Sequence, residues 1–483
     1  MSVTFEQIVS ARSRIDSGVL KTPCRESLAL SEQFEAQVFC KLEYLQRTGS
    51  FKERGARNAM LRLPIEAKVR GVIAASAGNH ALALAYHGRD LDIPVTVVMP
   101  VFAPMVKQTR CRQLGAKVVL YGANIGEARQ EADRLAAAHE FTYINGFDDP
   151  DVIAGAGSLG LEILEQVPEP DAIVVPIGGA GLIAGLALAV KTMRPETQII
   201  GVEPAFAASY TAALAAGGPV QAPVEATLGD GLAVPRVGDN AFEIARRFVD
   251  RVVLVDEAQI AVGILRILEM DKGLVEGAGA APVAAMLSGQ LDDLKGKRVV
   301  LTLCGGNIDP AVLDRVIDFG LVADGRLARF SVVISDRPGG LAALTRLIAD
   351  AGASVKQIRH ERAFASTDMS KVTVVYTIEN REGLGASKHD GHRPRNITIF
   401  LDVLFSLPHI NVPIYNHFVT NKGRQTALHF CDFSCHIPHF TVSLDHEKTA
   451  TAFNRISHLP HNSSSYNRHG LCYHCKSRRL QSC

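Results

Sequence analysis

The feature that most constrains the fold is an alternation of short apolar runs with longer amphipathic patterns between Val38 and Gly306. The apolar runs are rich in β-branched residues and are typical of strands buried on both faces of a parallel sheet. These predicted strands span residues 72–76, 95–100, 117–121, 141–144, 172–177, 198–203, 252–255 and 298–303. We therefore expect an α/β fold over residues 1–322, built as two doubly wound parallel-sheet units or as one large unit.

Composition and charge argue against several classes of partner. The 483 residues include 51 Lys+Arg and 50 Asp+Glu, a net charge of +1, so no overall field attracts nucleic acid or an anionic membrane. Residues 1–15 form an amphipathic helical pattern with a possible capping box at Thr4 and Gln7, and they lack an apolar signal core. We expect a cytoplasmic protein without nucleic-acid or membrane partners.

Two further observations agree with a cytoplasmic location. The cysteines of the first 383 residues lie without pairing spacing, as is typical where thiols stay reduced. They are Cys24, Cys40, Cys111 and Cys304. The run Ala172–Val190 is uncharged and long enough to suggest a membrane span, but Pro176 and several glycines interrupt it. We predict a buried strand, a glycine loop and a helix for this run.

A lysine in the stretch Thr48–Gly55 is placed for covalent chemistry. Lys52 follows the strand-like run Val38–Glu43 and a Gly-Ser turn, and it opens a predicted helix over residues 52–63. Its amine therefore has a fixed position near a helix start, which suits a lysine that forms an imine. Taken alone, the same pattern is also that of a surface lysine on a charged helix.

Glycine-bearing turns follow two of the predicted strands, at the strand ends where parallel sheets bind their ligands. The turn Ser76-Ala77-Gly78-Asn79-His80 precedes the predicted helix 81–88. Its main-chain N–H groups suit a carboxylate, and Asn79 can donate to a phenolate-like oxygen, although an ordinary capping turn is the alternative. The loop Gly178-Gly179-Ala180-Gly181-Leu182 lies between a strand and a helix, and its N–H groups would cradle a phosphate.

The glycine loop is also compatible with a nicotinamide dinucleotide. The spacing Gly179-x-Gly181-x-x-Ala184 fits the dinucleotide fingerprint, and Glu203 stands at the next strand end, about where a ribose-binding acid belongs. A nicotinamide-dependent oxidoreductase is therefore a rival, although it explains neither the lysine nor the first turn. Near residue 304 the last strand ends in Cys304, whose thiol could face a ring nitrogen or simply fill the core.

These elements occur in an order that resembles a known family. The lysine, the Ser-x-Gly-Asn-His turn, the glycine loop and the strand end Cys304-Gly305-Gly306-Asn307 resemble the fold-type II pyridoxal-phosphate enzymes, and among them the threonine/serine dehydratases, or threonine ammonia-lyases, over about residues 5–320. The resemblance implies pyridoxal 5′-phosphate as cofactor and β-elimination of L-threonine or L-serine to a 2-oxo acid and ammonia. It also implies a homo-oligomer, dimer or tetramer, in amino-acid metabolism such as isoleucine biosynthesis.

The resemblance assigns roles residue by residue. Lys52 falls on the Schiff-base position, with Phe51 beside the cofactor, and Asn79 falls on the residue that bonds the cofactor's phenolic oxygen. Cys304 falls on the partner of the ring nitrogen. The phosphate loop falls on Gly178, Gly179, Ala180, Gly181 and Leu182, and the substrate carboxylate site on Ser76, Ala77, Gly78, Asn79 and His80. The family's loop usually reads four glycines, so we expect Ala180 to keep its N–H donor only if its φ stays negative.

Position 77 separates the relatives within this family. Serine racemases carry a serine there that exchanges a proton with the substrate, which Ala77 cannot do, so dehydration is favoured over racemisation. The racemases also bind a divalent cation near a Val-Glu-Pro strand end, present here as Val202-Glu203-Pro204, but Ala208-Ser209 stands where an Asp is expected, and we predict no metal. A hydroxyaspartate dehydratase-like lyase and a catalytically dead amino-acid sensor are further alternatives. Glu276 either lines the site or is an acid at a helix start.

The chain changes character after residue 325. Strands predicted over residues 329–335, 354–362 and 371–379 and a helix over 341–351 give the order βαββ, which resembles an incomplete ACT domain, an amino-acid-sensing module, over residues 326–383. Residues 384–483 are rich in His and Cys and predict an irregular, poorly ordered tail. The spacings Cys431-x-x-x-Cys435 and Cys472-x-x-Cys475 can ligate zinc, but we favour a chance cluster because no regular finger spacing joins them.

Overall fold

The chain folds around two parallel sheets, as seen in a computed structural model that describes residues 3–362 and 370–379. The larger sheet has the strand order β1-β2-β10-β7-β8-β9, and the smaller has the order β5-β4-β3-β6. Every strand pair in these two sheets is parallel except β1 with β2. The chain therefore forms two sheet units, and the expected α/β class is confirmed.

The strands agree closely with those expected from the sequence. In the larger sheet they are β1 (Cys24–Glu26), β2 (Gln37–Leu42), β7 (Ala172–Pro176), β8 (Gln198–Pro204), β9 (Arg251–Val255) and β10 (Arg298–Leu303). In the smaller sheet they are β3 (Val72–Ala75), β4 (Val95–Met99), β5 (Lys117–Leu120) and β6 (Thr142–Tyr143). All eight predicted spans are confirmed to within two residues at each end. The short edge strand β1 was not predicted, because its sequence Cys-Arg-Glu has no apolar pattern.

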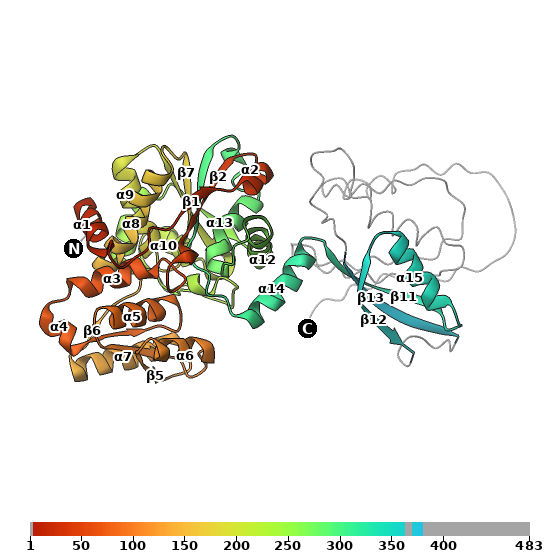
Figure 1. Cartoon of the computed structure of the whole chain (residues 1–483), viewed down its shortest axis with the longest axis horizontal. Helices are drawn as coiled ribbons and strands as arrows, with labels where there is room; N and C mark the ends of the chain where they lie inside the picture. The colour runs from red at the N-terminus through yellow and green to blue at the C-terminus, as the bar shows by residue number, and fades with distance from the viewer. Residues whose placement is uncertain (1–2, 363–369, 380–483) are drawn as a thin grey trace, which may run out of the picture. The chain divides into compact units, whose positions relative to one another are not determined.

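Helices cover both faces of the larger sheet. Figure 1 shows α8 (Pro150–Gln166) and α9 (Gly181–Met193) on one side of β7, with α12 (Glu257–Arg266) and α13 (Gly277–Leu287) on the other. The remaining helices of this part are α1 (Phe5–Ile15), α2 (Leu28–Phe34), α3 (Lys52–Arg62), α4 (Ile65–Arg70), α5 (Asn79–Asp90), α6 (Met105–Gln113), α7 (Ile125–His139), α10 (Ser209–Ala216), α11 (Asp239–Phe248) and α14 (Pro310–Ala323). The predicted capping box of α1, formed by Thr4 and Gln7, is confirmed.

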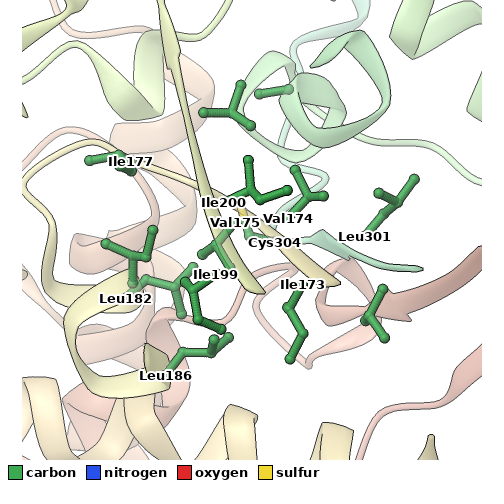
Figure 2. Packing of buried hydrophobic residues seen from close by; sticks show 14 of the residues in the cluster. Ile173, Val174, Val175, Ile177, Leu182, Leu186, Ile199, Ile200, Leu301 and Cys304 are labelled. Atoms are coloured by element: carbon green, nitrogen blue, oxygen red, sulfur yellow. The ribbon is translucent and has the colours of Figure 1, made fainter. Parts of the chain in front are cut away.

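The core of the larger unit is built from the two faces of its central strands. Figure 2 shows Ile173, Val174 and Val175 of β7 in the same buried cluster as Ile199 and Ile200 of β8 and Leu301 of β10. Burial on both faces explains why these strands are continuously apolar rather than alternating. The uncharged run 172–190 is confirmed as a strand, a glycine loop and a helix, and no helix among the described residues is long and apolar enough to cross a membrane.

The C-terminal part that is described has the expected order of elements. It consists of β11 (Leu327–Ser335), α15 (Gly340–Asp350), β12 (Ser354–Glu361) and β13 (Lys371–Glu379), and β13 pairs antiparallel with both other strands. A small core that includes Leu344, Ile348 and Tyr376 joins α15 to this sheet. The ACT resemblance and the boundaries 1–322 and 326–383 stay predictions. The tail 384–483, with its cysteine pairs, lies outside the described residues.

Candidate active site

The start of α3 is bonded to the carboxyl end of β10. The N–H of Phe51 donates to the C=O of Cys304 at 3.0 Å, and the N–H of Gly306 donates to the C=O of Gly49 at 2.9 Å. Gly49 has φ +80°, a left-handed conformation that glycine adopts without strain. These bonds fix the turn that precedes Lys52, so the lysine lies at a strand end of the larger sheet, where parallel sheets bind ligands.

The Lys52 amine is partly buried and has an unusually low pKa. Its Nζ donates to the C=O of Gly146 at 2.6 Å and lies 5.0 Å from the centre of the Phe51 ring. Burial lowers its pKa to about 8, although the nearby acidic groups of Cys304 and Glu276 act in the opposite direction. An amine with this pKa is unprotonated in a useful fraction of molecules near neutral pH, so it can act as a nucleophile and as a base.

The turn 76–80 joins β3 to α5 and presents free main-chain donors. The N–H of Ser76 donates to Val98 within the sheet, and the N–H of Gly78 donates to the Ser76 hydroxyl at 3.3 Å. The N–H groups of Ala77, Asn79 and His80 find no acceptor among the residues that the structure describes. Unpaired donors at the start of a twelve-residue helix attract a carboxylate.

The His80 side chain does not take part in carboxylate binding by the turn. Its Nε2 bonds to the C=O of Ile144 at 2.9 Å, and the ring is buried. Burial, helped by the charge of Lys52, lowers the pKa of His80 to about 4, so the ring is neutral near pH 7. His80 therefore offers the turn only its main-chain N–H group.

Two asparagines and a glutamate link the turn to the lysine segment. Asn79 donates through Nδ2 to Glu276 Oε1 at 2.6 Å and accepts through Oδ1 from Asn307 Nδ2 at 2.8 Å. Asn307 Nδ2 also donates to the C=O of Thr48 at 2.7 Å. One hydrogen on Asn79 Nδ2 is still available, so Asn79 can donate to a ligand oxygen while its amide plane is held.

Glu276 lines the site instead of capping its helix. It stands at the N-cap of α13, but its side chain makes no capping bond, and it contacts Asn79. Burial raises its pKa to about 7, with the charge of Asp230 adding to the effect and the Asn79 bond opposing it. A carboxyl with this pKa changes its charge near neutral pH, as is typical of functional sites.

The loop 178–182 joins β7 to α9 and is built on close glycine contacts. A Cβ on Gly179 would lie 2.2 Å from the Phe147 ring, and one on Gly181 would lie 2.2 Å from the Phe147 carbonyl oxygen. The N–H groups from Gly178 to Leu182 find no acceptor within the described part of the chain. The loop therefore packs tightly on Phe147, and its free donors suit an anion.

The backbone of Ala180 does not meet the condition stated from the sequence. The N–H donor was expected to survive only if φ stayed negative, but Ala180 has φ +71° and ψ −3°, the left-handed conformation. The turn requires this conformation at the residue before α9, and an alanine there is strained by roughly 1–2 kcal/mol. The N–H of Ala180 is nevertheless free, so the donor is kept at the expense of local strain.

One segment connects the lysine with the glycine loop. The Lys52 amine contacts the carbonyl of Gly146, and the next residue, Phe147, packs against Gly179 and Gly181. The amine and the glycine loop therefore both contact the dipeptide Gly146-Phe147. Cys304 belongs to the same neighbourhood, because the charges of Lys52 and Glu276 both act on its thiol.

The Glu203 carboxylate is already hydrogen-bonded within the protein. Its carboxylate is fully buried and accepts from the N–H of Tyr210 at 2.7 Å and from the N–H and hydroxyl of Thr211 at 2.9 and 2.6 Å. It thus caps α10 and is not available to a ribose hydroxyl, which removes the main support for a nicotinamide cofactor. Among residues 3–362 and 370–379, no group of three His, Cys, Asp or Glu side chains could hold a metal ion.

Comparison with known proteins decides the family. A family model described as pyridoxal-phosphate dependent enzyme matches residues 15–305, which is more than half of the chain. The chain belongs to the pyridoxal-phosphate dependent enzymes. The match contains Lys52, both N–H-bearing turns and Cys304.

Relatives and solved structures of this pyridoxal-phosphate enzyme include lyases and racemases. L-Threonine ammonia-lyase of Thermotoga maritima is 43% identical over 361 residues, covering 75% of this chain and 90% of that protein. The enzyme of the same name from Geobacter sulfurreducens is 45% identical over 377 residues, covering 78% and 94%. The processed form of threonine deaminase isoform 2 from Solanum lycopersicum has a TM-score of 0.63 at 36% identity, covering 65% of this chain and 93% of that one. Maize serine racemase has a TM-score of 0.63 at 33% identity, covering 65% and 97%.

The residues of this pyridoxal-phosphate enzyme fit the cofactor. The site offers an amine of lowered pKa for the aldehyde, a glycine loop with free donors for the phosphate, and the amide of Asn79 for the phenolic oxygen. The Cys304 thiol has a pKa raised by burial, so it stays protonated and neutral. A neutral group suits a ring nitrogen that carries no proton.

Three functional residues were not assigned roles from the sequence. Asn307 was quoted as part of a strand end, but its two donor bonds join Thr48 to Asn79. Gly146 contacts the Lys52 amine through its carbonyl, and Phe147 supports the loop. A carbonyl contact leaves no signature in a sequence, whereas the polar strand end Gly305-Gly306-Asn307 could have indicated the role of Asn307.

Proposed function

We propose that this pyridoxal-phosphate enzyme is an L-threonine ammonia-lyase, which converts L-threonine to 2-oxobutanoate and ammonia and takes L-serine as a second substrate. The single observation that carries the proposal is the partly buried Lys52 amine, with its pKa lowered to about 8, in a chain whose relatives at 43% and 45% identity are L-threonine ammonia-lyases. The carboxylate of an amino acid suits the free N–H groups of the turn 76–80.

Binding is assigned to the free donors around Lys52. The N–H groups of residues 77, 79 and 80 hold the substrate carboxylate, and those of residues 178–182 hold the cofactor phosphate. Asn79 donates to the phenolic oxygen, and Phe51 packs beside the Lys52 amine. The Cys304 thiol faces the ring nitrogen and leaves it without a charge, since burial keeps the pKa of the thiol high.

Lys52 moves the proton in the proposed reaction. When bound, pyridoxal phosphate supplies a conjugated ring that withdraws electrons and makes the substrate Cα–H acidic. The free amine of Lys52 then takes the Cα proton, which its lowered pKa allows near neutral pH. The β-hydroxyl leaves as water with the proton that Lys52 took from Cα, and addition of one water to the product imine releases the 2-oxo acid and ammonia, so protons and water balance overall.

Position 77 favours elimination over racemisation. A racemase needs a second group that delivers a proton to the opposite face of Cα, and the methyl group of Ala77 has no proton to exchange. This supports a lyase, even though maize serine racemase is among the similar structures. A catalytically dead amino-acid sensor is disfavoured because such a protein has no use for an amine of lowered pKa.

A substrate panel tests the proposed function. Purified protein would be loaded with pyridoxal phosphate and assayed with L-threonine, L-serine and 3-hydroxyaspartate for ammonia and for the 2-oxo acid, and with each enantiomer of serine for racemisation. We expect L-threonine to give 2-oxobutanoate and ammonia in equal amounts, with the highest kcat/KM of the panel. Racemisation faster than ammonia release, or preference for 3-hydroxyaspartate, would contradict the assignment.

The assembly and location of the enzyme are part of the same proposal. We infer a homo-oligomer, dimer or tetramer, which is supported by the exposure of large apolar side chains next to β4, among them Phe102 and Met105. We also infer a cytoplasmic location, since Cys24, Cys40, Cys111 and Cys304 are all free thiols. Light scattering coupled to gel filtration would give the number of copies.

A further inference from the structure

A buried chain of polar groups begins at the turn before Lys52. Glu53 is fully buried, and its Oε1 accepts a hydrogen bond from the N–H of Thr48. Its Oε2 lies 3.6 Å from Nε2 of His87, and the His87 side chain is also fully buried. At this separation the two atoms make a polar contact that is longer than a hydrogen bond, and neither has a hydrogen-bond partner within the described residues. The carboxylate therefore has two neighbours, a main-chain donor and an imidazole.

The chain continues from His87 to the surface. Arg57 donates to Nδ1 of His87 at 3.2 Å and to the half-exposed carboxylate of Asp90 at 2.5 Å. A guanidinium has only N–H donors, so Nδ1 must present its lone pair. In the neutral ring the proton then lies on Nε2, which faces Glu53. Burial lowers the pKa of His87, which favours this neutral ring.

The turn before Lys52 is held through both main-chain polar groups of Thr48. The N–H of Thr48 donates to Glu53, and its C=O accepts from Asn307, which also donates to Asn79. A Cβ added to Gly49 would lie 2.7 Å from the Asn307 side chain, so the turn packs closely on Asn307. A displacement of Thr48 would therefore disturb the start of α3 and the orientation of Asn79 together.

We propose that Glu53 and His87 are positioning residues that set the place of the Lys52 amine relative to Asn79 through the Thr48 turn. The proposal rests on the proposed function of Lys52 as the cofactor-bearing lysine. A carboxylate is required at position 53 because it faces two donors and has none of its own. An amide there would turn an N–H group toward the N–H of Thr48 or toward Nε2 of His87, so either the Thr48 hydrogen bond or the favourable contact with His87 would be lost.

Two substitutions at position 87 separate positioning from space filling. His87→Asn keeps an acceptor for Arg57 near the place of Nδ1 but loses the donor to Glu53. His87→Gln keeps a donor to Glu53 near the place of Nε2 but loses the acceptor. Glu53→Gln provides an independent variant with nearly unchanged volume. For each protein we would measure the Kd for pyridoxal phosphate, the fraction of Lys52 trapped by borohydride, kcat and KM for L-threonine, and Tm.

The expected changes in Kd and kcat depend on whether position 87 keeps a hydrogen-bond donor that faces Glu53. We expect His87→Asn and Glu53→Gln to raise the Kd for pyridoxal phosphate and to lower kcat by roughly tenfold each, with KM changed much less, because misplacing the amine weakens its attachment and its reach. His87→Gln should recover most of both losses. Equal losses in the two His87 variants, or wild-type behaviour of Glu53→Gln, would overturn the proposal.

The readouts keep this proposal separate from the assigned reaction. Kd and the trapping of Lys52 need no substrate, so they compare the variants even if L-threonine is not turned over. A wild-type protein that attaches the cofactor at Lys52 but releases no ammonia from L-threonine would contradict the proposed function alone. If His87→Asn does not fold, Glu53→Gln carries the same comparison with wild type.

Discussion

At the scale of single residues, burial sets the protonation states around Lys52. Burial lowers the pKa of the Lys52 amine to about 8, raises that of Glu276 to about 7, and keeps the Cys304 thiol protonated. Glu276 acts on the charge of both Lys52 and Cys304, so the site combines a basic amine, a carboxyl that titrates near neutrality and a neutral thiol. This combination suits proton abstraction at Cα followed by elimination.

Ala180 is strained, and relieving the strain should stabilise the protein. Ala180→Gly removes the steric conflict of the left-handed conformation at φ +71°, and the greater flexibility of glycine in the unfolded chain offsets part of the gain. We expect the free energy of unfolding to rise by about 0.5–1 kcal/mol in urea denaturation. The control Ala187→Gly, inside α9, should lower it by about 1 kcal/mol or more. A decrease for Ala180→Gly would contradict the assigned strain.

Glu276 should make the stability of the cofactor-free enzyme depend on pH. Its pKa is about 7 in the folded protein, against the ordinary glutamate value of 4.5 in the unfolded chain, so the folded protein binds more protons between these values. The free energy of unfolding should therefore fall as pH rises from 4.5 through 7, by on the order of 3 kcal/mol. Glu276→Gln should lack this decrease. Identical pH profiles for the two proteins, measured by urea denaturation, would argue against the raised pKa.

Candidate site residues could be proposed from the sequence, but their conformations could not. Lys52, Asn79 and the glycine loop became candidates because short motifs follow predicted strands. The positive φ of Ala180 was not foreseen, since the same residue order is compatible with either sign of φ. The neutral role of the His80 ring was also hidden, because its partner Ile144 lies 64 positions away in the sequence.

At the scale of elements, α3 carries Lys52 and is anchored by a buried ion network. Arg54, two residues after the lysine, bonds to Glu43 after β2 and to Glu162 on α8, and Glu162 also pairs with buried Lys41 at 2.7 Å. These bonds tie α3 to the larger sheet and to α8. The network therefore holds the helix that positions the amine.

Removing one charge from this network should destabilise the fold strongly. Glu162→Gln leaves Arg54 and Lys41 buried with less compensating charge, so we expect the free energy of unfolding to fall by about 3 kcal/mol. The control Glu243→Gln breaks an exposed pair with Arg246 on α11 and should change stability by less than about 0.5 kcal/mol. Similar effects for the two variants in urea denaturation would disprove the special role of the network.

Element positions were easier to predict than the bonds between them. The continuous apolar runs placed eight strands to within two residues, because burial on both faces leaves a strong pattern. The partners of Arg54 lie 11 and 108 positions away, and nothing in the local sequence indicates that they meet. Such contacts depend on how α3 and α8 pack, which is decided only in the folded chain.

At the scale of the whole molecule, the proposed chemistry belongs to the part of the chain before α14. The lysine, both N–H-bearing turns, Cys304, Glu276 and Asn307 all precede residue 310. The β11–β13 sheet has a core of its own, so it is not needed to complete the core around β7.

Shortening the chain should leave the proposed reaction in place. A version that ends at Gly383 lacks the His- and Cys-rich tail but keeps every residue to which a role is assigned. We expect its kcat and KM for L-threonine to stay within about twofold of the full chain, because every residue to which a role is assigned precedes residue 310. Loss of turnover in a version that still attaches pyridoxal phosphate would show that the tail contributes to catalysis.

The central claim is that pyridoxal phosphate is attached to the Lys52 amine. The most direct measurement is reduction of the cofactor-loaded protein with borohydride, followed by digestion and mass spectrometry of the lysine peptides. We predict a phosphopyridoxyl group on Lys52 as the dominant product, and Lys52→Ala should lose both the visible absorption of the bound cofactor and 2-oxobutanoate formation. A stoichiometric label on another lysine, or undiminished 2-oxobutanoate formation by Lys52→Ala, would contradict the claim.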